Sequence, residues 1–131
     1  MRRLHILFVD SDPHIHDKIR QALGGEFTVQ CVGSIVEAKQ RLSVSPPDIV
    51  ISEVVVGDES GLDLCRYVRA NPLLRHLPIM LLTSMATLQD KVEGFQAGTD
   101  DYVVKPFDTY HLVARIKLLA RIKRLERRTT V

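Results

Sequence analysis

The apolar residues of this chain change their spacing repeatedly, and this alternation restricts the fold more than any other feature of the sequence. Short unbroken apolar runs, typical of buried strands, alternate with longer segments in which apolar residues recur at helical spacing. We predict strands at residues 4–9, 27–31, 49–52, 79–82 and 102–104. Strands that alternate with helices pair in parallel, and unbroken apolar strands are covered on both faces. The predicted fold class is therefore α/β, with a doubly wound five-stranded parallel sheet.

Local signals mark the ends of the predicted helices. These helices cover residues 13–23, a segment that opens at 34, residues 61–70 and 87–97, and a last segment that starts at 108 and meets no breaker. Ser34 and Glu37 have the spacing of a capping box, and Asp108 is a favourable N-cap residue. Gly98 is a typical helix-ending residue.

The length of 131 residues corresponds to one domain. We predict a globular domain over residues 1–120, followed by a basic helical extension or linker at 121–131. Residues 115–128 include seven basic residues and one acid, Glu126, and carry a formal charge of +6. Because the whole chain carries +2, the remainder carries −4. A mildly acidic globule that ends in a basic helix is expected.

Cys31 and Cys65 lie far apart, and both occur in apolar patterns. We expect two buried, reduced thiols in a cytoplasmic protein. The apolar run near the amino terminus is interrupted by His5 and stops at Asp10, so it is too short for a signal peptide. No apolar stretch approaches the length of a membrane span. The histidines have no ligand-type spacing, so no metal site is expected from them.

Four residues of chemical interest directly follow predicted strands. Asp10 follows the first strand, Glu53 the third, Thr83 the fourth and Lys105 the fifth. In open α/β sheets the functional groups gather where the carboxyl ends of parallel strands meet. We therefore predict that these four side chains lie at one edge of the sheet.

Five stretches of the chain resemble, in order, the receiver domains of two-component response regulators. They are ILFVDSDP at 6–13, PDIVISE at 47–53, GLDL at 61–64, PIMLLTS at 78–84 and GTDDYVVKPF at 98–107. Each alone is a weak signal, but together they cover nearly the whole chain. The resemblance implies a flavodoxin-like (βα)5 receiver fold with strand order 2-1-3-4-5. Here an extended C-terminal helix follows, and the resemblance also implies a cis peptide bond before Pro106.

The resemblance further implies roles for single positions. In such receivers an aspartate after the third strand accepts a phosphoryl group from a partner kinase, and Glu53 stands at that position. Two acids after the first strand hold Mg²⁺, and the matching residues here are Asp10 and Ser11. A lysine contacts the phosphoryl oxygens, and Lys105 matches it.

The resemblance also implies a switch. A hydroxyl on the fourth strand moves to meet the phosphate, and an aromatic residue on the fifth strand follows it. Thr83 and Tyr102 occupy these positions.

Two of these positions depart from the pattern. Mg²⁺ requires near-octahedral oxygen ligands, and the neutral Ser11 hydroxyl is a poor replacement for a carboxylate. Glu53 is one methylene longer than aspartate, and we expect it to pair with Lys105. We therefore expect Mg²⁺ binding to be weak or absent. Glu53 has either an inert role or that of a partial phosphate mimic, since it carries one charge and a phosphoryl group about −1.5 to −2.

We interpret the chain as an atypical receiver without enzymatic activity, a protein-interaction module of two-component signalling that does not depend on phosphorylation. One alternative is an active phosphorelay receiver, phosphorylated at Glu53 or a nearby residue. The other is a regulator that binds nucleic acid through its basic tail. No aromatic residues interleave with the basic ones, which favours a linker or dimer helix over nucleic-acid binding.

The expected partners are a sensor kinase or other signalling proteins. The last helix is either a dimer helix or a linker to an output domain after Val131. The face formed by the fourth helix, the fifth strand and the last helix contains Phe95 and Tyr102. Related receivers use this face for contacts with partners or with a second copy. We expect weak homodimerisation there, strengthened by an apolar stripe of the last helix, Leu118, Ile122 and Leu125. A second stripe, Leu112, Val113, Ile116 and Leu119, should pack on the sheet.

Overall fold

The computed structural model describes the backbone of residues 3–130 and the side chains of residues 3–123. In chain order the elements are β1 (His5–Val9), α1 (Pro13–Leu23), β2 (Thr28–Val32), α2 (Ile35–Val44), β3 (Ile49–Ser52), β4 (Val55–Val56), β5 (Glu59–Ser60), α3 (Gly61–Ala70), β6 (Ile79–Thr83), α4 (Leu88–Ala97), β7 (Asp101–Val104) and α5 (Thr109–Thr130). The predicted strands and helices are present, with ends that differ by about one residue.

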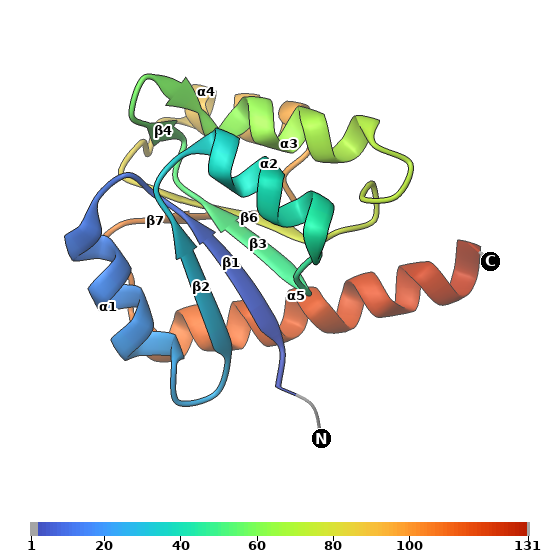
Figure 1. Ribbon diagram of the computed structural model, residues 1–131, viewed down its shortest axis with the longest axis horizontal. Coiled ribbons are helices and arrows are strands. Elements are labelled where there is room, and N and C mark those ends of the chain that lie inside the picture. The colour runs from blue at the N-terminus through green and yellow to red at the C-terminus, as the bar shows by residue number, and fades with distance from the viewer. Residues whose placement is uncertain (1–2, 131) are drawn as a thin grey trace.

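The sheet has five parallel strands in the order β2-β1-β3-β6-β7. Because β6 and β7 are the fourth and fifth predicted strands, this is the order that the resemblance implied. Helices α2, α3 and α4 lie on one face, and α1 and α5 lie on the other (Figure 1). The predicted doubly wound α/β architecture is confirmed.

Two apolar layers form the core, one on each face of the sheet. Alternate side chains of β1 point to opposite faces, so Leu7 packs with α2 and α3 while Phe8 packs with α1 and α5. The central strand β3 is buried along its whole length. A sheet covered on both faces requires such unbroken apolar strands, which explains why the sequence pattern located them.

The helix caps follow the sequence with one difference. Ser34 caps α2 by accepting from the Glu37 amide at 3.1 Å, but the Glu37 carboxylate accepts from the Gly33 amide instead of the Ser34 amide. The predicted capping box of α2 is therefore only half formed. A complete capping box occurs in α4, between Thr87 and Asp90.

A short hairpin was not predicted. Strands β4 and β5 pair antiparallel between β3 and α3, in a segment that sequence reasoning assigned to no element. Gly57 at its turn has φ +63°, a left-handed conformation that glycine adopts without steric cost. The Glu59 carboxylate accepts from the Ile35 amide at 3.2 Å and thereby joins the hairpin to the start of α2.

Helix α5 begins after the predicted cap, with the Asp108 carboxylate accepting from the His111 amide at 2.9 Å. Its first stripe packs on the sheet as predicted: Leu112, Ile116 and Leu119 are buried, and Val113 is half-buried. In the second stripe Leu118 and Ile122 are exposed, and the side chain of Leu125 lies outside the described residues. The helix runs through residue 120 without interruption, and the domain boundary there stays a prediction.

Both cysteines are free thiols. Cys65 is buried, as expected, and burial raises its pKa to about 11. Cys31 is only half-buried, because it lies on the edge strand β2, and this corrects the expectation of full burial. None of the helices within residues 3–130 combines the length and the apolar character that a membrane crossing requires.

Candidate functional site

Three charged side chains meet at the carboxyl edge of the sheet, as predicted. The Lys105 Nζ, after β7, lies 3.0 Å from Asp10 Oδ2, after β1, and 3.0 Å from Glu53 Oε1, after β3. The two carboxylate side chains are 4% and 12% exposed and that of Lys105 is 16% exposed, so the cluster is largely shielded from water. The expected pairing of Glu53 with Lys105 is present.

Both carboxylates are held by further donors. The second oxygen of Glu53, Oε2, accepts from the Val54 amide at 2.5 Å, and Asp10 Oδ1 accepts from the Asp12 amide at 2.9 Å. Each carboxylate therefore uses one oxygen for Lys105 and the other for the backbone. Charge-assisted hydrogen bonds of this kind fix a side chain in a single orientation.

The electrostatics of Lys105 reflect two opposing effects. Burial alone would lower its pKa, but the hydrogen bonds and the charges of Asp10 and Glu53 outweigh burial and raise the pKa above its usual value of 10.5. The lysine therefore stays protonated at neutral pH and supplies the positive charge of the site. The peptide bond that follows it, Lys105-Pro106, is cis.

The side chains of Ser11 and Asp12 accept hydrogen bonds from backbone amides outside the site. The Ser11 Oγ accepts from the Gly57 amide at 3.3 Å and contacts the β4–β5 hairpin. Asp12 is the N-cap of α1, where its side chain accepts from the His14 amide at 2.9 Å. Neither residue adds a carboxylate to the site.

These donors do not fit Mg²⁺, which the resemblance associates with this edge. One carboxylate, Asp10, comes from the first loop, and all four oxygens of Asp10 and Glu53 already accept hydrogen bonds. An octahedral ion held mostly by oxygen anions would have to replace Lys105 as their partner. Within residues 3–123 no three histidine, cysteine, aspartate or glutamate side chains are placed to hold a metal ion.

Thr83 and Tyr102 meet at the backbone of Met85. The Thr83 hydroxyl, which is buried, accepts from the Met85 amide at 3.2 Å, and the Tyr102 hydroxyl donates to the Met85 carbonyl at 2.7 Å. Burial raises the pKa of Tyr102, and the charges of Asp90, Glu53 and Glu93 raise it further. Tyr102 is only 8% exposed, so its side chain adds little surface to the face formed by α4, β7 and α5.

Sequence reasoning missed two glycines that shape the site. A Cβ on Gly61 would collide with the backbone carbonyl of Glu53, so only glycine lets α3 start this close to the site. A Cβ on Gly94 would lie 3.0 Å from the Tyr102 ring, which packs directly on α4. The sequence held a partial signal, because Gly61 opens the GLDL stretch of the resemblance.

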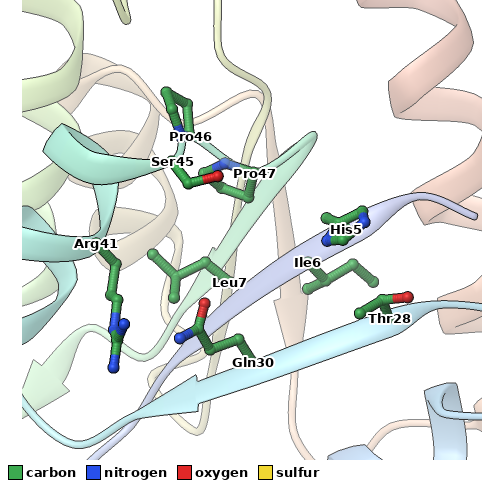
Figure 2. Close-up of a pocket in the computed structure, with 9 residues that line it drawn as sticks. All are labelled: His5, Ile6, Leu7, Thr28, Gln30, Arg41, Ser45, Pro46 and Pro47. Carbon is green, nitrogen blue, oxygen red and sulfur yellow. The ribbon is translucent and has the colours of Figure 1, made fainter.

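A separate hollow of about 370 Å³ opens at the opposite edge of the sheet, beside the amino ends of β1 and β2 (Figure 2). Its lining includes His5, Thr28, Gln30 and Arg41 and none of the predicted site residues. The Asp10–Glu53–Lys105 cluster therefore remains the candidate site.

Comparison with curated proteins finds transcriptional regulators. The chain is 37% identical over 117 residues to the transcriptional regulatory protein GltR of Pseudomonas aeruginosa, and the match covers 88% of this chain and 48% of that protein. It is also 37% identical over 117 residues to the phosphate regulon transcriptional regulatory protein PhoB of Rhizobium meliloti, with 88% and 52% covered. The chain thus spans about half the length of these relatives.

Solved structures show the same fold. The signal receiver domain of a signal transduction histidine kinase from Syntrophus aciditrophicus is 30% identical, with a TM-score of 0.83 and 90% of each chain covered. A CheY-like receiver domain protein from Methanospirillum hungatei, at 23% identity, has a TM-score of 0.87 over 95% of this chain and 99% of its own. The model of the response regulator receiver domain family matches residues 6–117. The chain therefore belongs to the response regulator receiver domain family.

Proposed function

We propose that this receiver domain acts as a protein-interaction module of two-component signalling and does not use aspartyl phosphorylation. The observation that carries the proposal is the state of Glu53. A glutamate stands at the acceptor position, and both of its carboxylate oxygens are engaged, one by Lys105 and one by the Val54 amide. An attacking carboxylate oxygen would have to leave one of these partners.

The lack of a metal cradle supports the same proposal. Phosphoryl transfer depends mostly on positioning and on neutralising the charge that develops on the phosphoryl oxygens. Ser11 contributes a neutral hydroxyl that already contacts the hairpin, and Asp12 caps α1. Lys105 is then the one cation at the site within the described residues, and two carboxylates already share it.

Glu53 acts, in this proposal, as a partial mimic of a phosphorylated residue. Tyr102 is buried and bonded to Met85, an inward position that suits an aromatic residue that has followed the switch hydroxyl. Thr83, however, bonds to the Met85 amide and has no hydrogen bond to Glu53 in the structure. The variant Glu53→Gln tests this role, because loss of the charge should shift the NMR signals of Met85 and Tyr102. Unchanged signals would indicate an inert glutamate.

A magnesium titration tests the proposal without a phosphodonor. Millimolar Mg²⁺ should leave the NMR signals of residues around Asp10 and Glu53 unchanged in this protein. The matched control is the double variant Ser11→Asp with Glu53→Asp, which places an aspartate at both positions and should give a saturable shift. A saturable shift at these residues in the unmodified protein would contradict the proposal.

We propose the α4–β7–α5 face as the surface that meets a partner or a second copy. Exposed apolar side chains gather on these helices: Leu88, Val92 and Phe95 on α4, and Leu118 and Ile122 on α5. Apolar patches on a small domain often mark interaction sites. Sedimentation should show weak, concentration-dependent dimers that Phe95→Ala weakens. A strict monomer at high concentration would contradict self-association.

Helix α5 is proposed to connect the receiver to an output domain in the whole protein. The relatives GltR and PhoB, which this chain covers to about half their length, are named as transcriptional regulators. The alternative, direct nucleic-acid binding by the basic tail, predicts affinity that falls steeply with salt. A binding titration with duplex DNA at two salt concentrations separates the two, since the linker role predicts no binding by this chain alone.

A further inference from the structure

A second ion cluster lies at the amino-terminal edge of the sheet and includes the far part of α5. Asp100 directly precedes β7, and its two carboxylate oxygens have different partners. Oδ2 accepts from Arg69 at 2.7 Å and from the Ile79 amide at 2.9 Å, while Oδ1 lies 2.8 Å from the Nζ of Lys123. The three side chains are 14–22% exposed.

Arg69 holds the Asp100 carboxylate in place independently of the contact with α5. Its guanidinium group donates to three backbone carbonyls besides Asp100, those of Gly98 at 2.9 Å, Arg75 at 2.9 Å and Leu77 at 2.6 Å. The close approach depends on Gly98, where a Cβ would lie 2.6 Å from the Arg69 side chain. Arg69 thereby ties the end of α3, the loop before β6 and the end of α4 to one carboxylate.

Beyond Leu119 the apolar attachment of α5 weakens. Leu119 is 7% exposed, whereas Ile122 is 42% exposed. A hollow of about 540 Å³ lies between the α5 segment 111–122 and the start of β7 at Asp100 and Asp101. The Lys123–Asp100 contact therefore supplies an attachment where side-chain packing no longer does.

We propose that Asp100 and Lys123 form a latch that fixes the direction in which α5 leaves the domain. The carboxylate is immobilised by Arg69 and Ile79, so Lys123 meets a preformed acceptor and little side-chain freedom is lost on the domain side. Arg69 belongs to the last turn of α3 and donates to the carbonyl of Gly98, the C-cap of α4. A displacement of α4 would therefore move Asp100 and loosen α5. This inference concerns the exit of the helix and does not depend on which residue occupies the acceptor position.

The variant Lys123→Met tests the latch, because it removes the charge and keeps an apolar stem on the helix. Amide hydrogen exchange followed by NMR should accelerate about fivefold for residues 119–123 and stay unchanged in α1 and β3. The matched control is Lys117→Met, which removes another lysine of α5 whose ion pair with Glu26 is exposed on both sides. That control should leave the exchange of residues 119–123 unchanged.

A second variant separates the latch from the clamp, by which we mean the contacts of Asp100 with Arg69 and with the Ile79 amide. Asp100→Ala should accelerate exchange both in residues 119–123 and at the Ile79 amide, because it removes the carboxylate that accepts from that amide. Acceleration at Ile79 alone would overturn the latch, since the clamp would then be lost without any effect on α5. Unchanged exchange in Lys123→Met, or equal acceleration in Lys117→Met, would overturn it as well.

Discussion

The two edges of the sheet carry ion clusters of opposite composition. At the carboxyl edge two carboxylates, Asp10 and Glu53, share the single ammonium group of Lys105. At the amino edge the single carboxylate of Asp100 is shared by two cations, Arg69 and Lys123. The first cluster has an excess of one negative charge and the second an excess of one positive charge.

The difference shows which residue each cluster depends on. Among the described residues, Lys105 is the one cation that pairs with these two nearly buried carboxylates, and without it they would face each other in a poorly hydrated site. If either Arg69 or Lys123 were lost, Asp100 would keep the other cation and the Ile79 amide as partners. Within the described residues, Lys105 is thus the group that partly neutralises the carboxylates at the carboxyl edge.

The largest effect is expected from Lys105→Met, which should lower the free energy of unfolding by about 3 kcal/mol. The change leaves Asp10 and Glu53 buried with backbone donors alone. Urea unfolding at neutral pH and low salt measures it. A loss below about 0.5 kcal/mol, the range of an exposed ion pair, would show that the cluster is not stabilised by its lysine.

A smaller effect is expected from Arg69→Met, about 2 kcal/mol in the same measurement. Arg69 makes more hydrogen bonds than Lys105, but its side chain is 22% exposed, and Asp100 keeps Lys123 as a partner. A loss larger than that of Lys105→Met would reverse the ranking of the two clusters and contradict the comparison.

The smallest effect is a pH dependence. The pKa of Lys105 is raised in the folded protein, so its contribution is complete below its usual value of 10.5 and declines as the pH rises through the higher folded value. The stability difference between wild type and Lys105→Met should therefore narrow above pH 10.5 by about 1 kcal/mol per pH unit. Urea midpoints of both proteins on either side of that pH measure the narrowing, and Tyr102 titrates in both and cancels. A constant difference would indicate that the lysine is not held by the carboxylates.

The fold could be predicted because its signals are local. The unbroken apolar run of β3 and the period of α1 follow directly from burial on one or both sides, and the predicted bounds of β3 match the structure. The β4–β5 hairpin was not predicted from the sequence because its strands have two residues each, too few to show a period. The hydrogen bond from the Gly33 amide, and not the Ser34 amide, to the Glu37 carboxylate was not predicted because two adjacent amides compete for one carboxylate.

The site could be predicted as a set of positions but not as a network. Strand ends placed Asp10, Glu53 and Lys105 together, and the resemblance added their expected roles. The Ser11 contact with Gly57 and the inward position of Tyr102 depend on tertiary neighbours far along the chain. Lys123 was read only as part of a basic run, because charge counting does not reveal which cation meets a fixed carboxylate such as Asp100.

Phosphate incorporation tests the central claim most directly. Four proteins are compared by intact mass with Mg²⁺ and a small phosphodonor: wild type, Ser11→Asp, Glu53→Asp and the double variant. The proposed function predicts no incorporation in wild type, little in either single variant and far more in the double variant, because acceptor and metal cradle act as a unit. Robust incorporation in Glu53→Asp alone would show that Ser11 does not prevent metal binding. Robust incorporation in the unmodified protein would contradict the claim that this receiver works without phosphorylation.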